Sequence, residues 1–113
     1  MIHRFALPLT LCALLLGTAA PAGAEEPLTI PLSIKNHRFN PDRVEVPAGK
    51  PFVLIVKNED ATPEEFESKM LHREKVIQGG KEAKIKFDAL KPGEYPFVGE
   101  FHEDQTKGVI VAK

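Results

Sequence analysis

Cysteine is almost absent from the sequence, because the single residue of this type is Cys12, which lies in an apolar run near the N-terminus. No thiol follows that run, so the rest of the chain can form no disulfide and offers no sulfur nucleophile and no thiolate ligand. Small exported domains often use disulfides to offset a limited core. This chain therefore has to depend on an efficient hydrophobic core.

A strong charge of either sign is also missing. The chain has 15 Lys and Arg against 16 Asp and Glu, a formal net charge of −1. A balance this close to zero excludes the basic footprint of a nucleic-acid-binding protein and indicates no membrane-surface patch. The sequence contains neither a Ser-His-Asp arrangement nor a phosphate-binding loop.

Long hydrophobic runs are limited to the N-terminus. Met1–Arg4 is short and basic, Phe5–Leu16 is almost wholly apolar, and Ala22-Gly23-Ala24 matches a small-residue cleavage site. This pattern predicts a secretory signal peptide over residues 1–24 and a single domain over residues 25–113. The apolar run is too short to span a bilayer and no second one follows, so we expect export without membrane insertion after cleavage.

Strand-like alternation begins directly after a short leader at residues 25–28. Ile30, Leu32 and Ile34 alternate with polar residues or proline, which predicts a half-buried strand, and Pro31 predicts that the strand lies at a sheet edge. The continuous apolar run 52–56 predicts a central strand packed on both faces. Further strands are expected at 44–46, 83–87, 94–99 and 108–112, separated by Pro/Gly turns at 47–50, 79–80 and 91–93.

The segment 63–72 has two interpretations. Pro63-Glu64-Glu65 could open a helix with Phe66 and Met70 on one side, or Glu65-Phe66-Glu67 could form a strand followed by an irregular loop. We expect Met70 to fill the core beside Phe66 and His72 to be exposed to solvent.

Six or seven short strands at regular spacing predict an all-β, Greek-key β-sandwich. The expected core residues are Ile34, Phe39, Leu54, Val56, Phe87, Tyr95, Phe97 and Val109.

The order of these pieces resembles the cupredoxin family over nearly all of the chain after the leader. The matching motifs are Phe39-x-Pro41, Val44-x-Val46-x-x-Gly49, Val56-x-Asn58, Leu90-x-Pro92-Gly93-x-Tyr95-x-Phe97, His102 and Gly108. The resemblance implies a β-sandwich with metal-binding loops at one end.

The chain departs from the blue-copper pattern at the ligand positions. Gly99 stands where blue-copper members carry cysteine, the upstream histidine position falls near Glu64, and the methionine position holds Gln105 or a neighbour. A type-1 copper site needs the thiolate, so blue-copper electron transfer is strongly disfavoured.

The segments 64–68 and 99–102 instead resemble the EfeO-type cupredoxin-like branch, and more closely the small periplasmic proteins that accompany ferrous-iron permeases. This resemblance implies periplasmic metal handling in iron uptake. It also implies a membrane iron permease and other periplasmic uptake components as partners, and iron or copper as the bound metal.

The candidate metal ligands lie on two segments and one upstream bend. Carboxylates two residues apart share one face of a strand and repel each other unless a cation or protons neutralise them. The candidates, which we expect to surround one transition-metal ion, are His37, Glu64, Glu65, Glu67, Glu100 and His102. Glu64 falls on the opposite face of a regular strand from Glu65 and Glu67, and we rank it second. Imidazole and carboxylate ligands suit Fe(II), Mn(II), Cu(II) or Zn(II).

We therefore expect a periplasmic metal-binding protein that takes part in iron uptake. Oxidation of Fe(II) would be compatible with an oxygen-rich site, although the sequence contains no catalytic motif. One alternative is a copper carrier that depends on His37, His102 and Met70. Another is a metal-independent module that binds a protein partner through an exposed apolar patch.

Overall fold

A computed structural model describes residues 26–113, so the predicted signal peptide and Cys12 lie outside the described residues. Nine strands and one short 3₁₀ helix follow one another along this part of the chain. They are β1 (Leu28–Lys35), β2 (Arg38–Asn40), β3 (Arg43–Val46), β4 (Phe52–Asn58), β5 (Glu64–Ser68), β6 (Arg73–Ile77), β7 (Glu82–Phe87), β8 (Gly93–Gly99), η1 (Glu100–His102) and β9 (Lys107–Ala112). No helix in residues 26–113 is long and apolar enough to cross a membrane.

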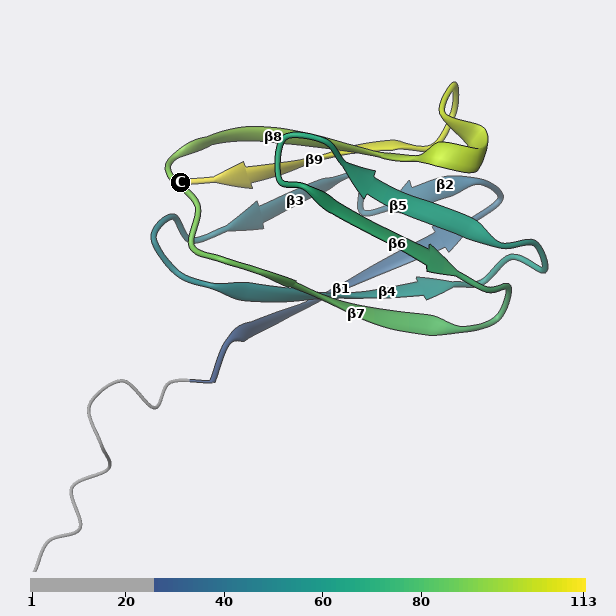
Figure 1. The fold of residues 1–113 in the computed structure, drawn as a ribbon, viewed down its shortest axis with the longest axis horizontal. Helices are drawn as coiled ribbons and strands as arrows, with labels where there is room; N and C mark the ends of the chain where they lie inside the picture. The colour runs from purple at the N-terminus through teal and green to yellow at the C-terminus, as the bar shows by residue number, and fades with distance from the viewer. Residues whose placement is uncertain (1–25) are drawn as a thin grey trace, which may run out of the picture.

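The strands form two sheets that pack face to face, as Figure 1 shows. One sheet has the order β2-β1-β4-β7 and the other the order β3-β9-β8-β5-β6. Both are mixed, because β1 runs parallel to β4 and β3 runs parallel to β9. The predicted all-β sandwich is confirmed.

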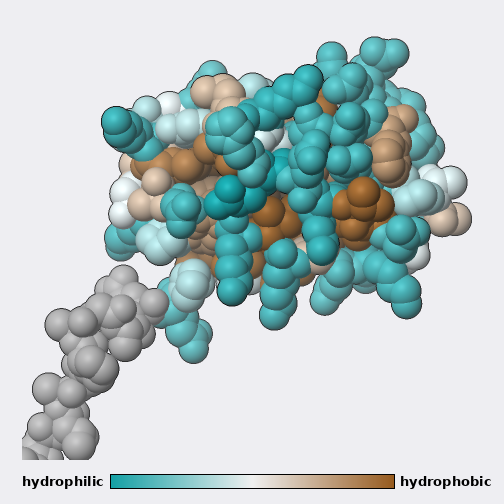
Figure 2. Space-filling model, in the orientation of Figure 1, coloured by the Kyte–Doolittle hydropathy of each residue, from teal (hydrophilic) through white to brown (hydrophobic). Residues whose placement is uncertain are grey.

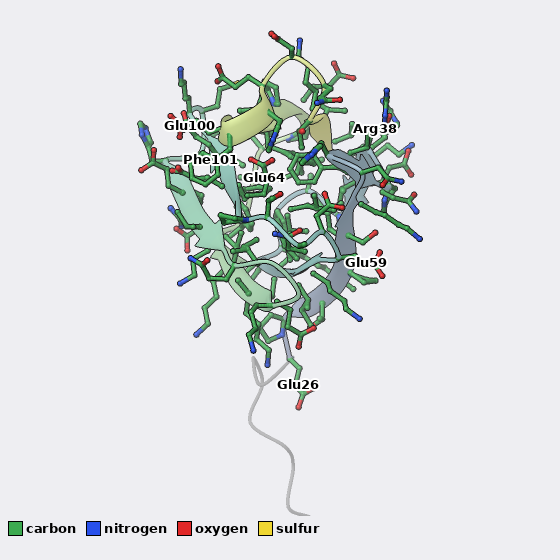
Figure 3. All side chains as sticks on the ribbon, turned by 90° about the vertical axis from the view of Figure 1, so that its right-hand side faces the viewer. Glu26, Arg38, Glu59, Glu64, Glu100 and Phe101 are labelled. Atoms are coloured by element: carbon green, nitrogen blue, oxygen red, sulfur yellow. The ribbon has the colours of Figure 1, made fainter. Side chains whose placement is uncertain are left out.

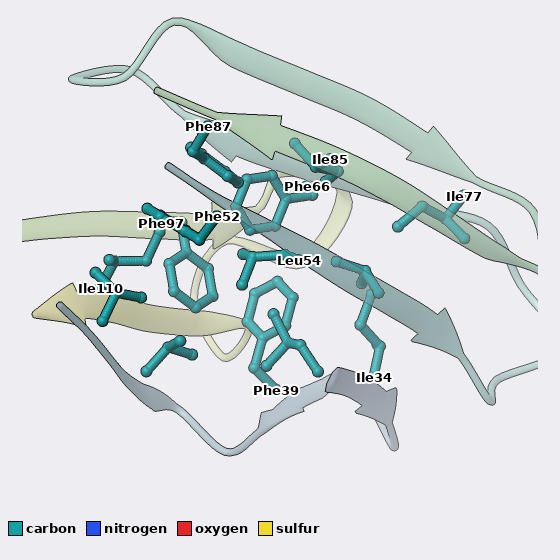
Figure 4. Packing of buried hydrophobic residues seen from close by; sticks show 14 of the residues in the cluster. Ile34, Phe39, Phe52, Leu54, Phe66, Ile77, Ile85, Phe87, Phe97 and Ile110 are labelled. Carbon is teal, nitrogen blue, oxygen red and sulfur yellow. The ribbon is translucent and has the colours of Figure 1, made fainter. Parts of the chain in front are cut away.

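The core lies between the sheets and is dominated by phenylalanine. Phe39, Phe66 and Phe97 contact one another, and Phe52 stacks on Phe87 with a centroid distance of 4.8 Å (Figure 4). Burying each such side chain contributes roughly 1.5–3 kcal/mol, and the aromatic geometry adds to this. A core of this kind stabilises the described domain without a disulfide.

Seven of the eight predicted core residues lie in this core or pack against it, with Tyr95 partly buried at its margin. Val109 is the exception: it is only half-buried, and Ile110 faces the core instead. The reason is the register of β9, in which Gly108 turns inward against Phe97. A β-carbon at position 108 would overlap the phenyl ring of Phe97. Because the side-chain period of a strand is two, Ile110 and Ala112 then follow Gly108 inward.

The structure also settles the open segment. Residues 64–68 form strand β5, which pairs with both β6 and β8, so the helix alternative is wrong. Met70 lies in the turn after β5 and is 58% exposed, so the expectation that it fills the core is also wrong. His72 is exposed as predicted.

Two expectations about the first sheet need correction. Val53 and Ile55 on β4 are only half-buried, because no second layer covers the outer face of the strand. β1 lies between β2 and β4 rather than at an edge. Pro31 is nevertheless tolerated, because β2 pairs with β1 only from Ser33 onward and leaves the first half of β1 with one neighbour.

Few large hydrophobic side chains remain exposed on the described domain. They are Leu28, Met70, Val76 and Phe101. Hydrophilic residues cover most of the face shown in Figure 2, with hydrophobic residues visible only in separate places. The apolar interaction patch that a metal-independent module would need is therefore not supported by this surface.

Candidate metal centre

One end of the sandwich gathers four segments that are far apart in the sequence. They are the β1–β2 turn, the loop after β4, the start of β5 and the helix η1 that follows β8. Figure 3 views the molecule from this end and shows Glu64 between the two sheets. Three candidate ligand atoms, one each from His37, Glu64 and His102, lie within 4.8 Å of one another here.

Glu64 is the most buried of these three residues, with 2% of its surface exposed. Its Oε1 accepts hydrogen bonds from the backbone amides of Glu65 (3.0 Å) and Phe101 (2.9 Å). Its Oε2 lies 2.6 Å from Nδ1 of His102. A carboxylate so far from solvent requires such partners, because burying an unpaired charge is very costly. These bonds also fix η1 against the start of β5.

The two histidines stack on each other. Their ring centroids are 3.7 Å apart and the ring planes are inclined by 26°. His37 is half-buried, and the hydroxyl of the buried Thr106 donates a hydrogen bond to its carbonyl oxygen. The imidazoles of the first hairpin and of η1 are thus held side by side.

The β1–β2 turn adopts an unusual backbone that presents His37 to the centre. Asn36 and His37 have φ values of 53° and 56°, and they form a two-residue hairpin loop between the paired residues Lys35 and Arg38. Positive φ at both positions is the signature of a type I′ turn, which matches the twist of a hairpin. Asparagine and histidine are among the non-glycine residues that adopt this region most readily.

Asp60 holds the turn from the opposite loop. Its two carboxylate oxygens accept hydrogen bonds from the amides of Asn36 (2.7 Å) and His37 (2.9 Å), and Oδ2 lies 3.6 Å from Nδ1 of His37. The hydrogen bond from the His37 amide, followed by that from Asn36, keeps the pKa of Asp60 below its usual value. Asn58 in turn accepts a hydrogen bond from the Asp60 amide and donates to the carbonyls of Thr62 and Ile77. Both histidines therefore have a carboxylate beside Nδ1.

Gly99 lies against this centre. A β-carbon at this position would be 2.8 Å from Cδ of Glu64 and would overlap the side chain of Thr106. The side chains of Thr106 and Glu64 therefore fill the space into which a residue 99 side chain would project. A cysteine could not be placed here without moving Thr106 and Glu64.

Comparison with known proteins agrees with this architecture. The family described as "Cupredoxin-like domain" matches residues 7–112. The chain belongs to the cupredoxin-like family.

Among the relatives of this cupredoxin-like chain is the uncharacterized protein RP394 of Rickettsia prowazekii (strain Madrid E). It is 44% identical over 84 residues, which cover 74% of this chain and 67% of RP394. Auracyanin A, a "blue" copper protein from Chloroflexus aurantiacus, superposes with a TM-score of 0.65 at 15% identity and covers 78% of this chain and 100% of its own. The chain also superposes on the metal-binding domain of CopA, the Cu(I)-exporting P-type ATPase of Streptococcus pneumoniae D39, whose structure was solved with Cu(I). The TM-score is 0.67 at 16% identity, and the match covers 79% of this chain and 89% of that chain. Likenesses at such identities show the fold alone.

A second group of carboxylates lies on the outer face of β5. Glu65, Glu67, Glu74 and Glu100 place one oxygen each within 4.8 Å of one another. Glu67 is largely buried, and its nearest cation is Nζ of the exposed Lys69 at 3.9 Å. The neighbouring carboxyl of Glu100, followed by burial, raises the pKa of Glu67.

The six predicted ligands thus fall into two groups on opposite faces of β5. His37, Glu64 and His102 lie together at the end of the sandwich, whereas Glu65, Glu67 and Glu100 lie together on the outer face with Glu74. The expectation of one site that combines Glu65, Glu67, Glu100 and His102 does not fit this arrangement. Alternation along β5 turns Glu64 inward beside Phe66 and turns Glu65 and Glu67 outward. Metal binding by either group stays a prediction.

Three contributing residues were missed in the sequence. Asn58 ends strand β4 and was noticed only as part of a family motif, and Asp60 follows two residues later in the loop. Two polar residues directly after the apolar run 52–56 could have indicated a structured loop. Glu74 pairs with Glu67 across the β5–β6 hairpin, and no local sequence signal indicates that register.

The donor set suits some metal ions of the family and not others. A type-1 copper centre does not fit, because Gly99 replaces the cysteine and Glu64 occupies the adjacent space. Two imidazoles and one carboxylate fit a divalent ion of borderline character, such as Fe(II), Cu(II) or Zn(II). Met70 contributes no thioether to this set, because it lines a separate hollow with Pro96 and Val98.

Proposed function

We propose that this cupredoxin-like protein binds a divalent transition-metal ion through His37, Glu64 and His102, and that it does so outside the cytoplasm. The observation that carries the proposal is the position of Glu64, a buried carboxylate within hydrogen-bonding distance of one of two stacked imidazoles. Asp60 would orient His37 as an outer carboxylate, since a histidine ligand generally uses its second nitrogen in a hydrogen bond. When bound, the ion would replace the contact between His102 and Glu64.

We further propose that the ion is iron and that the protein delivers it to a membrane permease. The support for this is the resemblance of segments 64–68 and 99–102 to the EfeO-type branch, together with a donor set of two histidines and one carboxylate, which is typical of non-haem Fe(II) sites. The predicted signal peptide supports a periplasmic location. The protein would act by binding and release rather than as an enzyme.

A periplasmic copper carrier is the second candidate. The two adjacent imidazoles favour it, because N/O sites generally bind Cu(II) more tightly than other divalent first-row ions. Under this alternative His37 and His102 would matter most and the carboxylate of Glu64 least. Met70 lines a hollow with Pro96 and Val98 and not with His37 or His102, so it does not supply the soft ligand that a Cu(I) carrier would use.

Calorimetric titration with Fe(II), Mn(II), Cu(II) and Zn(II) in the absence of oxygen tests both candidates. His102→Ala and Glu64→Gln should each weaken binding at least about tenfold, which corresponds to about 1.4 kcal/mol. His72→Ala is the matched control for the His37, Glu64 and His102 group, because His72 is an exposed histidine that belongs to neither group of candidate ligands, although it lines a hollow beside Glu67 and Glu74.

Three results would distinguish the alternatives. Loss of Fe(II) affinity in both site variants supports the proposed site. A requirement for the histidines but not for Glu64, with Cu(II) bound and Fe(II) not, supports the copper carrier. Unchanged affinity in both variants, or an equal loss in His72→Ala, contradicts a metal centre at this end of the sandwich.

A further inference from the structure

The outer face of the β2-β1-β4-β7 sheet is strongly basic. Strand alternation and pairing place five exposed cationic side chains on it, from all four strands, with Glu82 as the one acidic strand residue among them. The five are Lys35, Arg38, Lys57, Lys84 and Lys86, and we call this surface the basic face.

None of these five cations forms an ion pair within 4 Å in the part of the chain that the structure describes. The outer face of the other sheet has the opposite character. Its strands carry five outward glutamates against two cations, of which Arg43 is paired with Glu45 and Glu94. Outside the strands, Lys113 pairs with Glu45 and Lys69 with Glu67, so the cations on this side are largely compensated. The two faces of the sandwich therefore differ in charge. The formal net charge of −1, from which we expected no membrane-surface patch, does not reveal this difference because it sums over both faces. Uncompensated charge on one face is available to attract a partner of the opposite sign.

The middle of the basic face is apolar and slightly hollowed. Val53 and Ile55 are half-buried and, with Thr29, lie beside Lys84 and Lys86 in a hollow of about 370 Å³, next to Glu26 and Pro27. Lysine side chains can lay their methylene stems along such an apolar floor while the ammonium groups point outward. The face thus offers a shallow apolar centre with cations around it.

We propose that the basic face docks the protein on an anionic lipid surface. The composition favours lipid over a protein partner, because four of the five cations are lysines and the face has no aromatic residue. Protein interfaces are enriched in aromatic residues and arginine and depleted in lysine. Membrane surfaces attract clustered lysines without requiring a shaped pocket. A second copy fits less well, since the basic face of one molecule on the acidic face of the next would be a contact that does not close and would extend into filaments.

This docking is independent of the proposed metal centre. His37, Glu64 and His102 lie at the end of the sandwich rather than on the basic face, so docking through the basic face does not require this end to face the membrane. Figure 3 looks onto this end and shows Glu64 between the two sheets. Vesicle binding should therefore be the same with and without a chelator. A failure of metal binding and a failure of lipid binding can then be told apart.

Cosedimentation with vesicles of phosphatidylcholine, with and without phosphatidylglycerol, tests the inference. We expect binding that needs the anionic lipid and weakens as salt is raised. The double variant Lys84→Glu/Lys86→Glu should lower the partition coefficient at least about tenfold. Each lysine near an anionic surface contributes appreciably to the binding free energy, and each Lys→Glu change lowers the charge of the basic face by two units. The matched control is Lys91→Glu/Lys107→Glu, which changes the net charge equally but alters exposed residues outside the basic face.

Three outcomes would overturn the inference. Equal binding to neutral and anionic vesicles would mean that the cations are not responsible. An equal loss in the control variant would mean that only net charge matters. No binding to phosphatidylglycerol vesicles at low salt, together with retention on immobilised poly-glutamate, would identify an acidic polypeptide as the partner instead.

Discussion

Glu64 and Glu67 lie three residues apart on β5, and each is more than nine-tenths buried. Glu64 faces inward, where two backbone amides and an imidazole surround its oxygens. Glu67 faces outward among Glu65, Glu74 and Glu100, with only the exposed Lys69 nearby. One strand therefore buries two carboxylates in opposite electrostatic surroundings.

The comparison shows that burial alone does not identify a structural carboxylate. Hydrogen-bond donors aimed at a buried oxygen replace the water it has lost, so removing the oxygen leaves those donors unpaired. Neighbouring carboxylates do the reverse, since each makes the charged form of the other less favourable. We expect Glu64 to stabilise the fold and Glu67 to oppose it at neutral pH.

The largest effect should come from Glu64→Ala. This change leaves the amides of Glu65 and Phe101 and the ring of His102 without their acceptor, and we expect it to lower the free energy of unfolding by about 3 kcal/mol. Glu67→Ala is the comparison variant and should not lower it. Urea denaturation of both variants measures the difference, and equal losses would show that the two surroundings are not distinct.

Gly99→Ala should cause the second-largest loss of stability. The added methyl group would press on Glu64 and Thr106, and overpacking of this kind costs about 1–3 kcal/mol. Because it displaces Glu64, we also expect weaker metal binding in the same titrations. A variant that is as stable as the wild type and binds metal equally well would show that Glu64 is not held in place by this contact.

Asp60→Asn should produce a smaller loss, of about 1 kcal/mol at pH 7, because the amide can accept from only one of the two turn amides well. The lowered pKa of Asp60 means that its contribution is fully present above the ordinary Asp pKa of about 3.9 and is lost as the pH falls through the lower folded value. The gap between the wild type and the variant should therefore close in acid. Denaturation at a series of pH values checks this, and a gap that persists at the lowest pH would mean that the charge of Asp60 is not the cause.

The smallest change in stability should come from Glu100→Gln, and this variant should be more stable than the wild type rather than less. Glu100 raises the pKa of Glu67, so their repulsion destabilises the folded state once the pH rises above the ordinary Glu pKa of about 4.3. We expect a higher melting temperature for the variant at pH 7 and no difference near about pH 3. Thermal melting at both pH values measures it. The control is Glu59→Gln, because Glu59 is exposed and forms no ion pair within 4 Å among residues 26–113.

Most of the fold could be predicted from the sequence because strand alternation is a local property. The period-two pattern of Ile30, Leu32 and Ile34, and that of Ala83, Ile85 and Phe87, shows directly which side chains face inward. The wrong predictions concern residues whose position does not follow from the local sequence pattern. The apolar residues of β9 could face either way until Gly108 was seen against Phe97, and Met70 could be placed only once β5 was known to end at Ser68.

The residue types of the candidate site could also be predicted, but not their grouping. Sequence motifs marked all six candidate ligands, whereas the inward position of Glu64, the stacking of His37 on His102 and the role of Asp60 depend on contacts between residues 23 to 65 positions apart. By itself, the sequence determined that the chain forms a β-sandwich without a copper–thiolate ligand, because alternation, turns and composition are local. Only the tertiary structure decided which carboxylate meets the histidines, because that depends on which strands pair and on which face of β5 each side chain lies.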